Sequence, residues 1–498
     1  MTDAVRVDAR AVRVAPRTFA FAAIVLGAGL VRLVGVDRRW LWYDELLSAN
    51  WSVHGPWDAV LLAFRFDVHA PLYYVQLSLW ALAGRSDLWL MLNGVAWSMV
   101  AVAALMHVLA RTEGDRVAFC AGALLALAPA ALAHGDAVRM YPMLMALTIW
   151  AWDAQSRWLS GAPSAQATAL LIVSQLAVLY THGAGAVMLS GCLLYAALKV
   201  AERRDAALLQ RWALAELTTA ALAAPSLVFG RLRDVAHAQG ADLAAAWETW
   251  RFLAAGALAA SPWGAVLGAG LLGVLVWVCA VAPKRRLAVG CLVFAPMLAA
   301  ALISLAKPIW IDRIFVPVVP FLAMALAFAL TAQSRRLKAA AAAVALTWCG
   351  IGVAGQMVRE KGDGYRPAAA YVAAAARPGD LVLVDGERAY WCFLWYFAGP
   401  DWGHPREAAI FTSDWRDGLA RLHPRLADWL GFNAKQISVR VRGIEAAALQ
   451  QAPDARTRPR TTQHELFIVR SKPDGAPIEG RILVESRRMQ NLVVERWR

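Results

Sequence analysis

Long apolar blocks separated by short polar loops dominate the first 356 residues of the chain. Each block has the roughly 20 residues that a helix needs to cross a hydrocarbon core of about 30 Å. Backbone groups in lipid must bond within the chain, so these Ala- and Leu-rich blocks are expected to be helices. The blocks cover 19–36, 88–110, 117–133, 140–155, 167–182, 184–200, 212–230, 252–281, 287–306, 314–332 and 338–356. This pattern predicts a polytopic α-helical membrane protein with about 11 transmembrane helices.

A further apolar stretch at 71–83 is too short to span a membrane comfortably. We interpret it as a re-entrant or interfacial helix on the outer side. With the N-terminus inside, every cytoplasmic loop then carries Arg or Lys, as the positive-inside rule requires. Counting 71–83 as a span would invert every later loop. These loops are 111–116, 156–166, 201–211, 282–286 and 333–337.

The polar region 357–498 has the size of a domain and follows the last apolar block. A helical pattern starts at Pro367, and strand patterns occur in Asp380–Gly386, Gln436–Gly443 and Glu465–Arg470. We therefore expect a transmembrane catalytic domain over 1–356, with an outer first loop at 37–87. A small C-terminal α/β extracytoplasmic domain is expected over 357–498.

Composition agrees with a membrane protein, since 59% of the residues are hydrophobic and only 17% are charged. The formal net charge is +14, but the basic residues cluster in loops and act as topology signals. The expected partners are membrane lipids or a phosphate-bearing substrate, and no nucleic acid. The basic N-terminus precedes a long apolar run without a cleavage site. We therefore expect a multi-pass protein of the plasma (inner) membrane, with a cytoplasmic N-terminus and a periplasmic or extracellular C-terminal domain.

Candidate chemistry begins directly after the first apolar block, where Asp44 and Glu45 stand among Trp and Tyr. Aromatic belts at headgroup level explain the rings. Adjacent carboxylates near lipid are costly unless they are paired or used. The alternative to a catalytic role is that the two carboxylates balance Arg38 and Arg39.

Three other outer segments carry polar groups. His69 opens the short apolar stretch; it is either a ligand for substrate or metal, or a satisfied interfacial histidine. Asp136 and Arg139 lie three residues apart, and the arginine either clamps a phosphate or pairs locally with Asp136.

The segment with Lys307 and Arg313 places two cations outside, which suggests an anionic ligand or simple snorkelling. Sugar transfer from a polyprenyl phosphate requires a carboxylate that acts as the base and cations that stabilise the leaving phosphate. The base would be supplied by Asp44 with Glu45, and the cations by Arg139 with Arg313. All four are expected on the outer face of the membrane.

In sequence, these motifs resemble glycosyltransferase family 39. The similarity consists of Asp44-Glu45 after the first span, H-x-P-L-Y-Y from His69, a glycine-to-acid step from Gly84, and A-x-R-M-Y-P around Arg139. That family contains the protein O-mannosyltransferases and the lipid A aminoarabinose transferases, within the C superfamily of membrane glycosyltransferases. The similarity covers about residues 20–200, with a weaker match at Arg313.

The resemblance implies a C-type glycosyltransferase fold and sugar transfer from a polyprenyl-phosphate-linked donor to an acceptor hydroxyl on the outer face. Asp44 would be the catalytic base, with Glu45 as its partner. Arg139, Tyr141 and Arg313 would bind the donor or its phosphate, and His69 matches a position near the reaction centre that would bind substrate. From the residues themselves, we add Lys307 to the donor-binding group, and Tyr73 and Asp136 to the substrate-binding group. Some superfamily members use a divalent metal, for which Asp44, Asp136 and His69 are candidate ligands, although their spacing is not diagnostic.

Two other functions remain as alternatives. A lipid-linked glycan flippase or transporter would favour inverted repeats and midplane polar residues, which the sequence does not show. An O-antigen-ligase-like glycan transferase shares the basic outer pockets but does not need the Asp-Glu motif. The acceptor is a glycan, a lipid or a protein, and the sequence does not identify the sugar.

Overall fold

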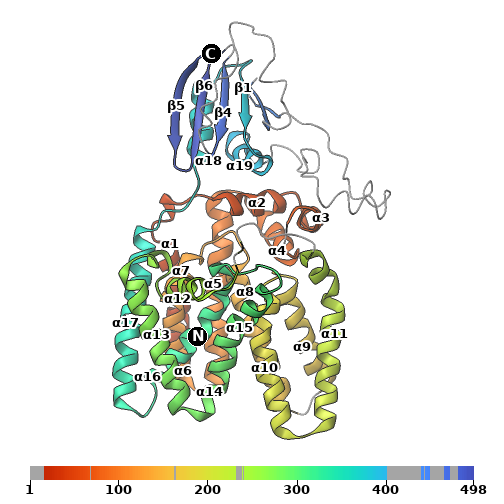
Figure 1. Cartoon of the computed structure of the whole chain (residues 1–498), viewed down its shortest axis with the longest axis vertical. Helices are drawn as coiled ribbons and strands as arrows, with labels where there is room; N and C mark the ends of the chain where they lie inside the picture. The colour runs from red at the N-terminus through yellow and green to blue at the C-terminus, as the bar shows by residue number, and fades with distance from the viewer. Residues whose placement is uncertain are drawn as a thin grey trace, which may run out of the picture.

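A helical bundle carries a small mixed sheet domain at one end (Figure 1). The computed structural model describes residues 16–67, 69–161, 164–231, 238, 240–400, 439–441, 444–448, 465–471 and 481–498. The short helices α2 (Tyr43–Ser52), α3 (Pro56–Phe66) and α4 (Leu72–Ala81) lie across the top of the bundle, directly beneath the sheet (Figure 1). Both the bundle and the sheet domain therefore face this layer.

Within the described residues, seven helical segments are long and apolar enough to cross a membrane. In the most apolar part of the segment Asp312–Leu330, 89% of the residues are buried inside the protein, compared with 17% for Arg17–Arg38 and 28% for Arg335–Val358. The outer helices expose large apolar side chains such as Leu26, Leu302 and Leu346, as lipid-facing surfaces do. The chain is therefore a polytopic integral membrane protein. The seven spans lie in α1 (Pro16–Leu33), α5 (Asp87–Thr112), α10 (Gly185–Arg203), α13 (Pro262–Val281), α14 with η3 and α15 (Pro283–Val289, Gly290–Phe294, Ala295–Ser304), η4 with α16 (Asp312–Val318, Val319–Leu330), and α17 (Arg335–Val358).

Three further bundle helices match predicted blocks: α8 (Tyr141–Ser160), α9 (Ala165–Leu179) and α11 (Ala206–Arg231). Two blocks predicted as continuous are broken. The block at 117–133 is α6 (Asp115–Leu127) followed by α7 (Pro129–Ala133), because a proline cannot continue the hydrogen-bond ladder. The count of eleven spans stays a prediction.

The prediction of one continuous helix over 252–281 is also wrong. That region contains the end of α12 (Leu243–Ala255), the short η2 (Gly256–Leu258) and α13. Gly256 has φ +53°, and a Cβ there would lie 2.5 Å from the carbonyl oxygen of Pro129. The break at Gly256 thus lets α7 approach the backbone of η2 closely.

The outer layer contains η1 (Val36–Arg38), α2 (Tyr43–Ser52), α3 (Pro56–Phe66) and α4 (Leu72–Ala81). At about 1.5 Å per residue, the ten residues of α4 are too short to span the bilayer, as the sequence predicts. The amide of Leu72 donates to the carbonyl of Tyr180 at 2.9 Å, which ties α4 to the loop between α9 and α10.

The sheet domain has the strand order β2-β3-β1-β4-β6-β5. The central strand β1 runs parallel to β3 and β4, whereas the β2–β3, β4–β6 and β5–β6 pairs are antiparallel. The small α/β domain predicted from the sequence is present, and part of the predicted strand at 436–443 lies outside the described residues. The elements are α18 (Tyr365–Ala375), β1 (Leu381–Val384), α19 (Glu387–Phe397), β2 (Val439–Val441), β3 (Ile444–Ala448), β4 (Leu466–Arg470), β5 (Leu483–Met489) and β6 (Leu492–Trp497).

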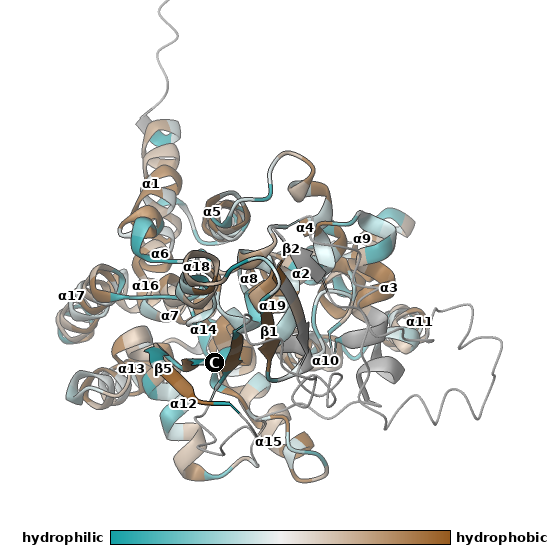
Figure 2. Ribbon diagram, turned by 90° about the horizontal axis from the view of Figure 1, so that it is seen from above, coloured by the Kyte–Doolittle hydropathy of each residue, from teal (hydrophilic) through white to brown (hydrophobic). Residues whose placement is uncertain are grey.

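Asp87 at the start of α5 fastens the sheet domain to the bundle. Its carboxylate accepts hydrogen bonds from Trp395 Nε1 at 3.2 Å and from the Tyr396 hydroxyl at 2.8 Å. Both aromatic residues belong to α19, which also packs on α2. The hydropathy view from above shows α19 and β1 over the centre of the helix bundle (Figure 2). The domain therefore covers the outer layer.

Candidate active site

The two adjacent carboxylates open α2, and the structure gives them different surroundings. Asp44 and Glu45 occupy the first turn of that helix, where the helix dipole stabilises negative charge. The side chain of Asp44 is 20% exposed, whereas that of Glu45 is fully buried. Only Asp44 is therefore accessible to a substrate.

Glu45 is held by three groups. Its Oε1 lies 2.6 Å from Lys361 Nζ and accepts the amide of Val138 at 2.9 Å, and its Oε2 accepts the amide of Trp42 at 3.2 Å. Burial raises the pKa of Glu45, against the opposing effect of Lys361. The side chain thus joins the start of α2 to two distant segments.

Asp44 faces a cation. Arg313 in η4 places Nη2 3.4 Å from Asp44 Oδ2, and its guanidinium lies 5.7 Å from the ring centroid of Trp42. Both charged side chains are part-exposed, at 29% and 20%. One alternative left open by the sequence is that Arg38 and Arg39 balance the charges of Asp44 and Glu45. In the structure Arg39 instead binds Asp136.

Arg139 also contacts the start of α2. Its Nη1 donates to the backbone carbonyl of Asp44 at 3.2 Å and to the Ser48 hydroxyl at 3.1 Å. The expected alternative of a local Asp136–Arg139 pair is not among the ion pairs of the described residues.

Asp136 lies in a buried cluster of cations. It accepts from Arg39 Nη1 at 2.5 Å and from Arg359, and Lys361 Nζ lies 3.8 Å away. Burial alone would raise the pKa of Asp136, but Arg359, Lys361 and Arg39 outweigh it and hold that pKa well below its usual range. The carboxylate is 1% exposed. Its surroundings are those of a structural ion cluster, in contrast to the expected substrate contact.

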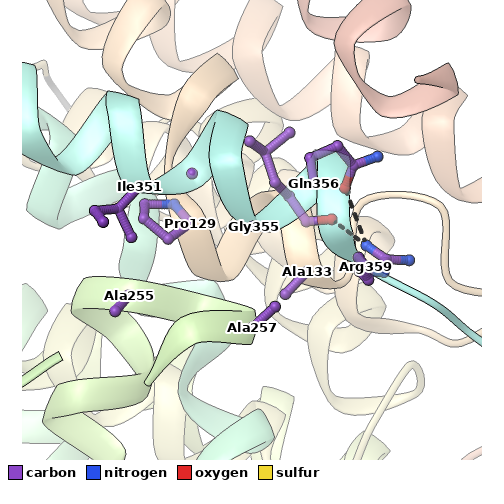
Figure 3. Close-up of a pocket in the computed structure, with 10 residues that line it drawn as sticks. Pro129, Ala133, Ala255, Ala257, Ile351, Gly355, Gln356 and Arg359 are labelled. Carbon is purple, nitrogen blue, oxygen red and sulfur yellow. Dashed lines mark hydrogen bonds between the residues drawn. The ribbon is translucent and has the colours of Figure 1, made fainter. Parts of the chain in front are cut away.

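Arg359 forms one wall of a small crevice behind this cluster, shown in Figure 3. The crevice is too narrow to admit a water molecule. Arg359 donates to the carbonyl of Leu132 at 2.6 Å and to Gln356 Oε1 at 3.4 Å, which directs it toward Asp136. The lining comprises Pro129, Leu132, Ala133, Ala255, Ala257, Ile351, Gly352, Gly355, Gln356 and Arg359.

A row of rings lies beside Arg139. His69 stacks on His182 with centroids 4.2 Å apart, and His182 lies 6.0 Å from the ring of Tyr141. Tyr141 in turn contacts His134 at 5.0 Å. Burial, with Arg139 and Arg313, keeps the pKa of His69 well below its usual value, so the ring is neutral at pH 7.

Tyr73 and Tyr74 in α4 are both buried. The Tyr74 hydroxyl donates to Asp67, whose other oxygen accepts the amide of His69 at 3.1 Å. Asp67 therefore fixes the turn that carries His69. Lys307 follows α15, and the described contacts of Asp44 do not include it.

The expected metal ligands do not assemble. Among the described residues, no group of three or more His, Cys, Asp or Glu side chains could hold a metal ion. Asp136 is already neutralised by Arg39 and Arg359. The residues present therefore do not fit the Asp44, Asp136 and His69 set considered from the sequence.

Sequence reasoning missed two contributors to this region. The segment 359–363 supplies Arg359, Lys361 and Asp363, and His182 comes from the loop between α9 and α10. Two signals were available: the Lys361-Gly-Asp-Gly turn directly after the last apolar block, and a polar Thr181-His182 step between two apolar blocks.

No family model matches the sequence, and no curated protein matches it. Solved structures do. ArnT from Cupriavidus metallidurans in the apo state aligns with a TM-score of 0.59 at 13% identity, covering 96% of this chain and 97% of that one. The same protein bound to undecaprenyl phosphate aligns at 0.57 and 15% identity, with the same coverage.

An oligosaccharyltransferase of Archaeoglobus fulgidus, in complex with Zn and sulfate, aligns less closely, at 0.49 and 12% identity over 90% of this chain and 68% of that chain. The ArnT likeness spans nearly the whole chain. The chain therefore has the fold of the C superfamily of membrane glycosyltransferases, as the resemblance at the sequence level predicts.

Proposed function

We propose that the chain is a glycosyltransferase that moves a sugar from a polyprenyl-phosphate donor to an acceptor hydroxyl. The observation that carries this proposal is the part-exposed carboxylate of Asp44, 3.4 Å from Arg313 and on the residue whose carbonyl binds Arg139. The candidate base Asp44 is thus in contact with two cations, Arg313 and Arg139. The fold supports it, since ArnT has the same fold and has been solved with undecaprenyl phosphate.

In the proposed reaction, Asp44 takes the proton of the acceptor hydroxyl as that oxygen attacks the anomeric carbon. The bond between this carbon and the phosphate oxygen breaks, and its electron pair leaves with the polyprenyl phosphate. Arg313 and Arg139 neutralise the charge that develops on the leaving phosphate. A single displacement of this kind inverts the anomeric centre. Tyr141 and Lys307 are assigned to the donor side as well.

Glu45 and Asp136 act as positioning residues in this scheme. Glu45 fixes the first turn of α2 through Lys361 and Val138, so that Asp44 stays beside Arg313. Asp136 holds Arg359 and Lys361 in place. His69 and Tyr73 remain assigned to substrate binding.

The proposed topology places the site at the periplasmic face of the plasma (inner) membrane, with the N-terminus in the cytoplasm. Residues 1–356 then form the transmembrane catalytic unit. Residues 357–498 form an extracytoplasmic domain that covers the outer layer and shapes the acceptor side. The proposed acceptor is a lipid or a glycan.

The test is donor turnover by the purified protein in lipid nanodiscs. A panel of polyprenyl-phosphate sugars is supplied with lipid and glycan acceptors, and release of free polyprenyl phosphate is followed. We expect one donor to be cleaved, with the sugar recovered on an acceptor in inverted configuration.

A parallel assay in sealed vesicles separates the flippase alternative. A flippase would move the intact donor across the bilayer without releasing polyprenyl phosphate. Transport without cleavage would therefore overturn the proposal. Asp242→Asn is the matched control for acidic substitutions, because Asp242 caps α12 through the amide of Ala245 at 2.7 Å, and asparagine caps equally well. It should turn over the donor as wild type does.

A further inference from the structure

Three buried donor groups have no hydrogen-bond partner in the described structure. They are Arg139 Nε, the Tyr73 hydroxyl and His182 Nε2. Their residues are only 5%, 1% and 4% exposed. A buried donor left without an acceptor is destabilising, so such groups are normally paired.

The three residues come from different segments of the chain. Tyr73 lies in α4, His182 lies in the loop between α9 and α10, and Arg139 precedes α8. Arg139 precedes Tyr141 by two residues, and the ring of Tyr141 lies 6.0 Å from that of His182. The charge of Arg139 also acts on the pKa of both Tyr73 and His182.

The hydrogen bonding of His182 fixes which ring nitrogen carries the proton. Nδ1 accepts the amide of Ala184 at 2.8 Å, so the neutral ring has its proton on Nε2. Burial, with His69 and Arg139, keeps the pKa of His182 well below its usual value. His182 Nε2 is therefore a donor at neutral pH, and it is the atom left unpaired.

The chemistry of these groups selects their ligand. Arg139 can only donate, the His182 nitrogen is a donor, and the Tyr73 hydroxyl has a proton to give. A sugar hydroxyl would bring its own proton, whereas a phosphoryl oxygen brings only lone pairs and negative charge. A buried guanidinium among neutral donors therefore suits an anionic phosphoryl oxygen.

We propose that Tyr73, Arg139 and His182 form a preformed oxyanion pocket that receives a phosphoryl oxygen of the lipid donor. His182 is the newly assigned ligand-binding residue in this pocket. The proposal rests on the proposed function, because it concerns the phosphate of the same donor. Arg313 then contacts the phosphate from the side of Asp44, and the oxyanion pocket contacts it from the side of α4.

The experiment measures the affinity of undecaprenyl phosphate and of uncharged undecaprenol for the full chain in nanodiscs. His182→Asn is the informative variant. The asparagine oxygen can still accept the Ala184 amide in place of Nδ1, but the Nε2 donor is gone. Tyr73→Phe removes only the hydroxyl. Tyr180→Phe is the matched control, because that hydroxyl lies near the same loop and donates to the carbonyl of Leu222.

We expect His182→Asn and Tyr73→Phe each to weaken undecaprenyl phosphate binding about tenfold or more, as loss of a hydrogen bond to a charged group does. Undecaprenol binding should stay unchanged, and Tyr180→Phe should bind both lipids as wild type does. Equal loss of both lipids in the two variants would indicate general damage to the fold and would overturn the assignment. Undiminished binding of the phosphate would overturn it too.

Inorganic phosphate provides a second arm. If it competes with undecaprenyl phosphate in wild type and loses this effect in His182→Asn, the pocket recognises the phosphoryl group itself, and the proposal gains support. If free phosphate competes equally well with both proteins, the oxyanion pocket lies elsewhere. Wild type that binds undecaprenyl phosphate no better than undecaprenol would contradict the proposed function itself, which separates the two failures.

Discussion

Lys361 Nζ lies 2.6 Å from Glu45 Oε1, and this ion pair joins the segment after the last bundle helix to the first turn of α2. The carboxylate is fully buried and the lysine side chain is 8% exposed. The backbone carbonyl of Lys361 also accepts a hydrogen bond from the backbone amide of Trp40 at 3.1 Å. The position of Asp44 therefore depends on a residue more than 300 positions away.

Lys361→Met should lower the free energy of unfolding by about 3 to 5 kcal/mol, because it leaves Glu45 as a buried charge without its cation. Chemical unfolding in detergent micelles measures this loss. Lys361 opposes the rise that burial causes in the pKa of Glu45, so without it the carboxylate takes up a proton more readily as the pH falls, which removes the buried charge. The loss of stability should accordingly be larger at pH 8 than at pH 5.

The matched control is Lys199→Met. Lys199 pairs with Glu202 at 2.8 Å on an exposed helix surface, and such pairs contribute about 1 kcal/mol or less. If both lysine variants lose the same free energy of unfolding, the buried Lys361–Glu45 pair contributes no more to stability than an exposed pair, which would contradict this prediction. Adding Glu45→Gln to Lys361→Met should restore part of the loss, because no buried charge then remains.

Asp136 should make the folded state sensitive to acid. Its folded pKa is held below the usual 3.8 by Arg359, Lys361 and Arg39, against the effect of burial. The stabilisation is present above the unfolded pKa and is lost as pH falls below about 4. Melting temperatures between pH 6 and pH 3 should fall in wild type. Asp136→Asn should be less stable at pH 6 and should show a shallower fall. An equally steep fall in the variant would contradict this account.

Asp363 connects the sheet domain to the start of α2. Its Oδ2 accepts the amide of Tyr43 at 2.6 Å, and its Oδ1 accepts Asn491 Nδ2 at 2.9 Å. Asp363→Ala removes the acceptor of a helix-terminal amide next to Asp44, at a cost of about 1 kcal/mol in helix stability. We expect roughly tenfold slower turnover, because a misplaced base slows proton transfer.

Asn491→Ala removes the bond to Asp363 and the acceptor of the Gly364 amide, but it leaves the Asp363–Tyr43 contact in place, so turnover should fall less than in Asp363→Ala. Asp363→Asn keeps an oxygen acceptor for the Tyr43 amide and should retain most of the activity. Full activity in Asp363→Ala would show that this contact does not position the carboxylate.

Arg313 should act in the reaction itself. Arg313→Ala should lower kcat/KM about 100-fold, and Arg313→Lys should recover part of it, since lysine keeps the charge without the planar fork. Arg366→Ala is a matched control: Arg366 also lies over a tryptophan, 5.9 Å from the ring of Trp40, but outside the site. Steady-state turnover of the donor measures all three variants, and equal losses in Arg313→Ala and Arg366→Ala would remove Arg313 from the mechanism.

Local patterns in the sequence were enough to predict the helical bundle and much of the candidate site. Block length indicated the spans, and charged residues beside apolar blocks pointed to Asp44, Arg139 and Arg313. The structure brings these three together at the start of α2. The break at Gly256 was missed, because a glycine within an apolar block gives no sign of the close backbone approach that requires it.

The partners of the buried carboxylates could not be predicted in the same way. Lys361 and Arg359 reach Glu45 and Asp136 across more than 200 residues, and a single sequence contains no measure of such distances. Asp136 and Arg139 are neighbours on the chain, yet their side chains bind different groups. Proximity in sequence thus identified the region of the site and not the pairing within it.

The most direct test of the proposed mechanism compares Asp44→Asn with Glu45→Gln in nanodiscs, with a cleavable polyprenyl-phosphate sugar and its acceptor at saturation. If Asp44 is the base, Asp44→Asn should release polyprenyl phosphate at least about 100-fold more slowly while still binding the donor and keeping its melting temperature. Glu45→Gln should mainly change stability. Release at the wild-type rate by a folded Asp44→Asn protein would contradict the assignment of Asp44 as the catalytic base.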